Sequence, residues 1–315
     1  MQTLTNEIQQ EVNKVILGKQ DVVRKVLTAI LAGGHVLLED VPGVGKTTMA
    51  MAFAITLGLS TKRVQFTSDT MPSDIIGFSV YDKDGGALRY QPGAVMTNLL
   101  LADEINRTSP KTQSALLEAM EERRVTVDGV TRELPEPFVV LATQNPVGSA
   151  GTQKLPESQL DRFLIQLSMG YPDVASQAAL MKERHHDDPL DSCRPVTDTQ
   201  GLVELCRQAM ETYVADELYL YIAELAEATR THADVVLGLS PRGALALTRA
   251  AKANAFLEGR EYAVPDDVGA MFADVTAHRL VLSARARLHE VTGRQMAGEI
   301  LSQVRRPDVR EFRLK

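Results

Sequence analysis

The sequence of 315 residues contains no tryptophan, two cysteines and few aromatic side chains, which make up 5% of it. Cys193 and Cys206 do not form a disulfide framework or a zinc-type pair, which is typical of a reducing compartment. No apolar run approaches the roughly twenty residues that a membrane-spanning helix requires. The N-terminal residues also lack the basic start and apolar stretch of a signal peptide. These absences predict a cytoplasmic protein without membrane insertion.

Positive charge is also scarce. Thirty-four lysines and arginines stand against 41 aspartates and glutamates, so the formal net charge is −7. This balance argues against nucleic acid as a partner, although it leaves room for a local basic groove. The run from His185 to Asp188 fits a solvated linker better than a metal site, because four adjacent residues do not easily converge on one ion.

Five short apolar runs alternate with stretches of helical periodicity. Runs of this length, with almost no polar interruption, are typical of parallel strands that are buried on both faces. They are HVLLE (35–39), RVQFT (63–67), NLLLAD (98–103), FVVLATQ (138–144) and FLIQLSM (163–169). The alternation predicts an α/β fold with a five-stranded parallel sheet flanked by helices.

Two stretches interrupt this alternation. Residues 81–93 hold a Gly-Gly turn between short aromatic arms, and residues 123–134 alternate valines around Asp128-Gly129. Both patterns predict β-hairpins inserted into the α/β scheme.

The pattern changes after Tyr171-Pro172. A polar linker over residues 185–198 leads into a stretch that is helical to the end of the chain. We therefore predict an α/β core over residues 1–195 and an all-helical domain over residues 196–315.

The segment EDVPGVGKTT, residues 39–48, resembles a phosphate-binding loop. Gly43 and Gly45 let backbone N–H groups approach phosphate oxygens, Lys46 would reach the outer phosphates, and the Thr47 hydroxyl would hold Mg²⁺. Asp40 stands where the usual pattern has glycine, so its carboxylate must point away from the nucleotide. The alternative is a plain strand-to-helix turn with an exposed lysine.

A second pair of acidic residues strengthens the nucleotide interpretation. The apolar run 98–103 ends in Asp103-Glu104, at the edge of a parallel sheet where ligands bind. Asp103 can hold the Mg²⁺ shell, and Glu104 can polarise an attacking water. On its own, this pair would equally be a solvated strand end.

Three further polar residues lie where hydrolysis would use them. Asn145 follows the fourth apolar run, which should place it beside the acidic pair in such a sheet, and its alternative role is to start a turn before Pro146. Arg162 immediately precedes the fifth run, and Arg242 lies in the first turn of a helix after Ser240. Either arginine, taken alone, would fit a surface salt bridge.

Taken together, these segments resemble the MoxR family of AAA+ ATPases. The resemblance rests on LLEDVPGVGKTTMA, NLLLADEINRTSPKTQSALLEAMEERRVTVDG, FVVLATQNP, LPESQLDRF and LSPRGAL. It covers nearly the whole chain and is weakest over residues 1–34 and 172–235.

The resemblance implies a role for each matching residue. Glu104 and Asp103 resemble the Walker B pair, Asn145 resembles sensor 1, Arg162 the arginine finger of a neighbouring subunit, and Arg242 sensor 2. The resemblance also implies a nucleotide-binding set formed by Leu17, Gly18, Gly43, Val44, Gly45, Lys46, Thr47 and Thr48. Leu17 and Gly18 belong to ILGKQDVV, which loosely matches the segment that lines the adenine pocket.

The resemblance further implies ATP as substrate, Mg²⁺ as cofactor, a C-terminal helical lid domain and assembly into a homo-oligomeric ring of six subunits. The expected partner is a protein with a von Willebrand factor A domain that carries a metal-ion-dependent adhesion site.

Four other functions compete with this interpretation. A GTPase would carry an Asn-Lys-x-Asp segment, which the sequence lacks, and a small-molecule kinase would not need Glu104 or Arg242. Related ring ATPases that act on DNA or insert metal into a macrocycle share both hairpin inserts. A scaffold that uses ATP only as a switch would not need Glu104 to polarise water.

Overall fold

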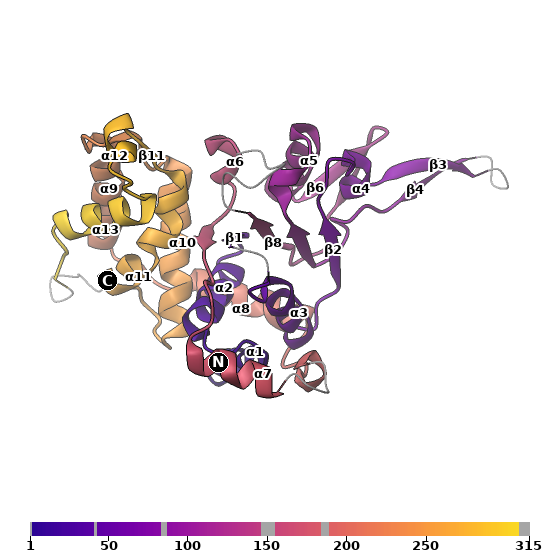
Figure 1. Ribbon diagram of the computed structural model, residues 1–315, viewed down its shortest axis with the longest axis horizontal. Helices are drawn as coiled ribbons and strands as arrows, with labels where there is room; N and C mark the ends of the chain where they lie inside the picture. The colour runs from indigo at the N-terminus through magenta and orange to yellow at the C-terminus, as the bar shows by residue number, and fades with distance from the viewer. Residues whose placement is uncertain (1, 41–42, 83–86, 146–154, 184–188, 309–315) are drawn as a thin grey trace.

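Five short strands form one parallel sheet at the centre of the computed structural model, which describes residues 2–40, 43–82, 87–145, 155–183 and 189–308 (Figure 1). All of the paired strands in it run parallel, and the order is β2-β5-β8-β1-β9. Their bounds are β1 (Val36–Glu39), β2 (Thr61–Gln65), β5 (Leu99–Asp103), β8 (Val139–Gln144) and β9 (Ile165–Leu167). The five predicted strands are confirmed, each within three residues of its expected start.

Helices cover both faces of this sheet (Figure 1). Side chains alternate along each strand, so Val36 and Leu38 join one buried apolar cluster while Leu37 joins another. The first cluster includes α1 (Gln2–Val15), α2 (Gln20–Leu31) and α3 (Lys46–Thr56); the second includes α4 (Pro72–Ile76) and α5 (Pro110–Glu122). Apolar cover on both sides explains why the strands read as continuous apolar runs.

Two antiparallel hairpins leave this three-layer core, as predicted. The first pairs β3 (Phe78–Asp82) with β4 (Ala87–Gln91) and extends far from the body of the molecule (Figure 1). Its predicted Gly-Gly turn lies outside the described residues. The second pairs β6 (Arg124–Val127) with β7 (Val130–Glu133) through Asp128 and Gly129, which both have positive φ.

The rest of the chain is mostly helical. Its helices are α6 (Glu157–Leu160), α7 (Val174–Glu183), α8 (Thr199–Glu211), α9 (Asp216–Thr231), α10 (Pro241–Leu257), α11 (Pro265–Thr276), α12 (Ala284–Leu288) and α13 (Gly293–Gln303). Single 3₁₀ turns cover Ile105–Arg107, Pro189–Ser192 and Ala277–Arg279. The prediction of an all-helical domain is wrong in one detail. β10 (Val235–Leu237) and β11 (Val281–Leu282) pair as a small antiparallel ribbon. Such short strands lack enough alternating residues to be distinguished from helix ends.

The C-terminal helices pack against the β9 edge of the sheet and against α2. The buried guanidinium of Arg279 anchors this contact: it donates to the backbone oxygens of Phe163 at 2.7 Å and Leu164 at 3.2 Å, and to the Asp161 carboxylate at 2.6 Å. These bonds fix the C-terminal part beside the residues that immediately precede β9. The exact boundary at residues 195 and 196 stays a prediction.

Candidate functional site

The glycine-rich loop follows β1 and opens α3, as a phosphate-binding loop requires. Gly43 and Gly45 have φ of 87° and 94°, which side chains with a Cβ rarely adopt. Apart from its chain neighbours, none of the residues that the structure describes lies within 4 Å of the position where a Cβ on Gly43 would be, so this side of the loop is open. The arrangement leaves backbone N–H groups and the N-terminus of α3 accessible to an anion.

Lys46 is the first residue of α3, and its Nζ donates to the backbone oxygen of Asp40 at 2.8 Å. Burial lowers the pKa of Lys46, while the nearby carboxylates of Asp40, Asp103 and Glu104 oppose that shift. Lys46 therefore lies in the same electrostatic neighbourhood as the acidic pair at the end of β5.

The side chain of Asp40 points away from the loop, as the sequence required. Its carboxylate accepts hydrogen bonds from the Ser168 hydroxyl at 3.0 Å, from the Gly170 N–H at 3.1 Å and from the Met169 N–H. This buried aspartate thus joins the start of the loop to the segment after β9. No sequence signal points to this partner, because the adjacency of β1 and β9 is a property of the sheet.

Asp103 closes β5 and is almost completely buried. Its carboxylate accepts from Arg63 Nε at 2.8 Å and from the Thr143 hydroxyl at 3.3 Å. Neither partner is predictable from the sequence alone. Arg63 lies on β2 and Thr143 on β8, the two strands that flank β5, and their neighbourhood follows only from the strand order.

Glu104 adopts a left-handed backbone conformation with φ of 59° directly after β5. Its carboxylate accepts from the Asn145 side-chain amide at 3.1 Å and from Arg107 Nη1 at 2.8 Å. Burial raises the pKa of Glu104, but the hydrogen bonds from Arg107 and Asn145 outweigh it and the net pKa is lowered. Glu104 is therefore an anion at neutral pH, held at two points.

Asn145 is fixed in turn by Asn106. The Asn106 amide donates to the backbone oxygen of Asn145 at 3.1 Å, and the Asn145 N–H reaches the Asn106 side-chain oxygen at 3.4 Å. The predicted meeting of Asn145 with the acidic pair is thus present in the structure.

Leu17 and Gly18 lie in the turn between α1 and α2, next to the start of α7. A Cβ on Gly18, whose φ is 71°, would meet Ser176 Oγ at 2.2 Å, and Lys19 Nζ donates to the Tyr171 oxygen at 2.8 Å. This turn therefore contacts the segment that follows β9.

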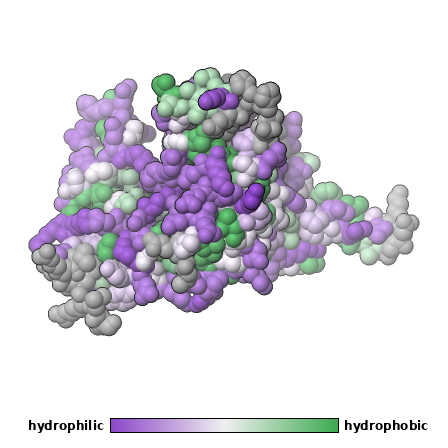
Figure 2. Space-filling model, turned by 90° about the horizontal axis from the view of Figure 1, so that it is seen from below, coloured by the Kyte–Doolittle hydropathy of each residue, from purple (hydrophilic) through white to green (hydrophobic). Residues whose placement is uncertain are grey.

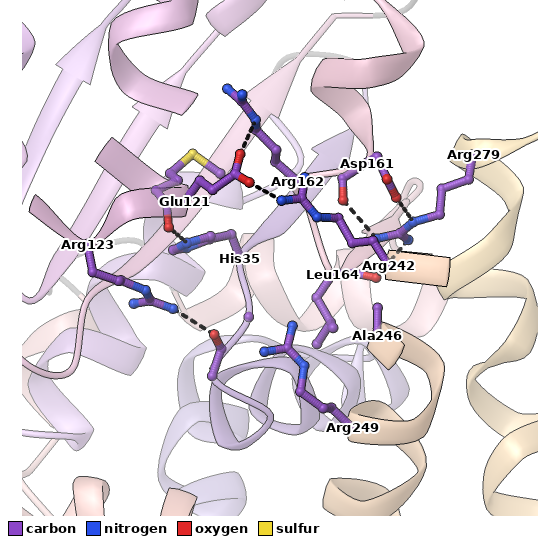
Figure 3. Close-up of a pocket in the computed structure, with 13 residues that line it drawn as sticks. His35, Glu121, Arg123, Asp161, Arg162, Leu164, Arg242, Ala246, Arg249 and Arg279 are labelled. Carbon is purple, nitrogen blue, oxygen red and sulfur yellow. Dashed lines mark hydrogen bonds and ion pairs between the residues drawn. The ribbon is translucent and has the colours of Figure 1, made fainter. Parts of the chain in front are cut away.

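Arg162 and Arg242 come together at a different place (Figure 3). Both contact the carboxylate of Glu121, near the C-terminal end of α5: Arg162 Nε lies 2.9 Å from one oxygen, and Arg242 pairs with the other. They line a cavity of 270 Å³ with Gly33, Gly34, His35, Met120, Glu121, Arg123, Asp161, Leu164, Ala246, Arg249 and Arg279. No sequence signal points to Glu121 or Arg249, because helix phase alone does not identify which helices meet.

The structure does not place this arginine pair beside the glycine-rich loop. In the register of the sheet, Val36 at the start of β1 pairs with Ile165 at the start of β9. Arg162 precedes that point, whereas Lys46 follows the far end of β1, and a four-residue strand alone separates the two ends by about 10 Å. The pair and the loop thus lie toward opposite ends of the parallel strands.

Exposed apolar side chains gather on the first hairpin: Phe78, Val80, Tyr81 and Leu88. The projecting arm in Figure 2 accordingly carries hydrophobic surface, while hydrophilic residues cover much of the body on that face.

Across the described ranges, no helix has the length and apolar character needed to cross a membrane. Those ranges also contain no cluster of three or more His, Cys, Asp or Glu side chains suited to a metal ion, and the run from His185 to Asp188 lies outside them.

Two family models match the chain. The model of the ATPase family associated with various cellular activities (AAA) matches residues 35–165, and the AAA lid domain model matches residues 227–303. A crystal structure of a protein assigned as an ATPase, from Cytophaga hutchinsonii, superposes with a TM-score of 0.90 at 36% identity and covers 98% of this chain and 96% of that one. A minichromosome maintenance (MCM) homologue from Methanopyrus kandleri, at 18% identity and a TM-score of 0.59, shares the fold.

Curated relatives match over most of their length. The Bacillus subtilis protein YeaC is 46% identical over 298 residues, which cover 95% of this chain and 93% of the relative. Chaperone MoxR1 of Mycobacterium tuberculosis is 38% identical, with 95% of this chain and 81% of the relative covered. Protein MoxR of Paracoccus denitrificans is 34% identical, with 86% of each covered. The chain therefore belongs to the MoxR family of AAA+ ATPases.

Proposed function

We propose that this chain binds and hydrolyses ATP and uses the energy as a chaperone-like ring motor. The observation that carries the proposal is the contact of Glu104 with Asn145 at the end of β5, in the electrostatic neighbourhood of Lys46. Water activation needs a carboxylate that is charged at neutral pH and is held in position, and this carboxylate meets both conditions.

The loop would bind the triphosphate through its backbone and through Lys46. The proposed nucleotide-binding residues are Gly43, Val44, Gly45, Lys46, Thr47 and Thr48, with Leu17 and Gly18 beside the base. The open space in front of Gly43 and the lysine at the start of α3 support this assignment.

Thr47 and Asp103 fit a Mg²⁺ ion. Both offer hard oxygen donors. Among the described residues, Asp103 Oδ1 has only one weak hydrogen bond, from Thr143 at 3.3 Å, so it retains acceptor capacity. Bound Mg²⁺ would neutralise charge on the outer phosphates. Arg63, which contacts the other oxygen of Asp103, would hold that carboxylate in position.

Glu104 would polarise the attacking water, and Asn145 would hold the Glu104 carboxylate in place. The left-handed backbone at Glu104 supports this role, because non-glycine residues in that conformation cluster at functional sites.

Arg162 and Arg242 would act at the site of a neighbouring subunit. They lie away from their own loop and share Glu121, so one surface of a subunit presents both guanidinium groups. Cations stabilise a phosphoryl transition state only at short range, so a neighbouring subunit in a homo-oligomeric ring would complete the site. We propose that this ring is a hexamer and that it works in the cytoplasm.

The proposed partner is a protein with a von Willebrand factor A domain. MoxR1 is named a chaperone, which supports a protein client, and the net charge of −7 weighs against DNA. The alternatives are a ring ATPase that acts on DNA or in metal chelation, and a nucleotide-switched scaffold. Stimulation of the ATPase by a protein carrying this domain, compared with stimulation by duplex DNA, distinguishes a protein-directed motor from a DNA-directed one.

The deciding experiment is Glu104→Gln. The variant keeps the shape of the side chain and loses the charge, so we expect near-normal ATP binding and a turnover lower by about two orders of magnitude. Phosphate release and fluorescent-nucleotide binding measure the two quantities. Glu118→Gln on α5 is the matched control. Undiminished turnover in Glu104→Gln would assign water activation to another group.

A further inference from the structure

Glu121 connects two arginines that come from different parts of the chain. Arg162 precedes β9 and Arg242 begins α10, and the Glu121 carboxylate lies between them with one oxygen toward each (Figure 3). Its neighbour Glu122 instead pairs with Arg124 at 3.1 Å on the exposed surface.

The contact leaves terminal nitrogens of both arginines available to a phosphate. Glu121 meets Arg162 at Nε, as an ion pair without hydrogen-bond alignment, and the two terminal nitrogens of Arg162 make no hydrogen bond within the described residues. Arg242 is held through one terminal nitrogen, and 47% of its side chain is exposed. Glu121 therefore leaves the terminal fork of Arg162 open and contacts one of the two terminal nitrogens of Arg242, so both guanidinium groups keep donors for phosphate oxygens.

The cavity around Glu121 is strongly positive. Its lining contains five arginines and two carboxylates, and the second carboxylate, Asp161, is already bonded to Arg279 and Ser240. His35 adds no charge, because burial lowers its pKa to about 3. Among the cavity-lining residues, Glu121 is thus the carboxylate that separates Arg162 from Arg242, and without it their like charges would repel.

We propose that Glu121 is a positioning residue of the trans-acting face: it holds Arg162 and Arg242 as one preorganised pair for the γ-phosphate of the adjacent subunit. This inference rests on the proposed function. A preorganised pair loses little rotamer freedom when the ring closes, and Glu121 keeps both guanidinium groups on one surface of the subunit.

The test uses mixtures of variant subunits. Glu121→Gln should lower kcat roughly tenfold to a hundredfold, as expected for misplaced catalytic groups, with little change in KM for ATP. Glu121→Gln has an intact loop, so mixing it with Lys46→Ala, whose arginine face is intact, should restore activity above either parent. Mixing it with Arg162→Ala should restore none, because both subunits are then defective on the same face.

Three results would overturn the proposal: undiminished activity of Glu121→Gln, recovery with Arg162→Ala, or no recovery with Lys46→Ala while the reference mixture of Lys46→Ala and Arg162→Ala does recover. If the reference mixture fails as well, the proposed trans assembly itself is wrong, and so is the role of Glu121 within it.

Glu122→Gln is the matched control and should behave like the unmodified protein. Glu121→Asp repeats the test with the charge kept and the reach shortened, in case Glu121→Gln does not fold.

Discussion

Single residues in the nucleotide site have two tasks. Asp40 binds Lys46 through its backbone oxygen and the segment after β9 through its side chain. A glycine, which the usual loop pattern has at this position, could do only the first. Aspartate at position 40 therefore adds a bond between two strands while it keeps the loop in place.

Lys46→Ala tests the phosphate loop directly. The substitution removes a charge-assisted contact to the outer phosphates, so ATP binding should weaken by at least about 2 kcal/mol, or roughly 30-fold in Kd. Titration with a fluorescent ATP analogue measures the change. Lys111→Ala, in the exposed first turn of α5, should leave Kd unaltered. Equal affinities for the two variants would contradict the phosphate-loop assignment.

Among the elements, the start of β1 depends on a neutral histidine. His35 Nδ1 accepts the Val140 N–H at 3.0 Å, and Nε2 lies 3.2 Å from the Met120 oxygen, so one tautomer joins β1 to β8 and α5. Burial, followed by the charge of Arg123, lowers the pKa of His35 from 6.5 to about 3. A second proton would remove the acceptor and cannot be bound without breaking the bond to Val140.

The lowered pKa makes stability depend on pH. Between pH 6.5 and about 3 the unfolded chain binds a proton at His35 that the folded chain does not, so stability is greatest above pH 6.5 and falls below it. Between pH 7.5 and pH 5.5, His35 should lower the free energy of unfolding by about 1.4 kcal/mol. Urea unfolding at both pH values measures this change. In His35→Gln, the free energy of unfolding should fall by about 1.4 kcal/mol less than in the unmodified protein. The same pH dependence in both proteins would mean that His35 is protonated in the fold.

The β3–β4 hairpin is the second element with a separable role. It extends from the core and exposes Phe78, Tyr81 and Leu88, which no packing within the sheet requires. We therefore expect it to contact a partner or the interior of a ring.

Replacing residues 82–87 with a short Gly-Ser turn should spare basal ATP hydrolysis. Stimulation by a purified protein with a von Willebrand factor A domain should fall, because the apolar arm is shortened. Tyr81→Ser with Leu88→Ser, which keeps the hairpin length, separates surface chemistry from reach. Loss of basal activity in either variant would place the hairpin in the catalytic machinery instead.

For the whole molecule, the separation of the loop from the arginine pair is the main consequence of the fold. The register of β1 and β9 puts Lys46 and Arg162 at opposite ends of the sheet. We therefore propose that a single subunit has Lys46 at its loop but lacks the arginine that hydrolysis needs there.

Specific ATPase activity should consequently rise with protein concentration through the range in which subunits associate. Lys46→Ala and Arg162→Ala should each be inactive alone and recover activity when mixed, because some interfaces then combine an intact loop with an intact arginine. Phosphate release across a dilution series, with sedimentation at the same concentrations, measures both effects. A rate independent of concentration, together with no recovery on mixing, would leave Arg162 a structural ion-pair residue.

The sequence by itself determined the local parts of this protein. Apolar runs bounded by turn residues located the five strands, because buried strands need apolar cover on both faces. Asp128-Gly129 located a hairpin, because its two residues accept positive φ. Lys46, Glu104 and Asn145 each follow a predicted parallel strand. The carboxyl ends of parallel strands lie at one edge of the sheet, so the sequence predicted that these side chains come together.

Only the tertiary structure decided which distant segments are neighbours. The bond of Asp40 to the segment after β9, the contact of Arg63 with Asp103, and the place of Glu121 between Arg162 and Arg242 all join residues far apart in the chain. Periodicity records which face of an element is buried but not the element against which it packs. Strand order and helix docking minimise exposed apolar area over the whole chain at once, and that global balance is not a property of any short segment.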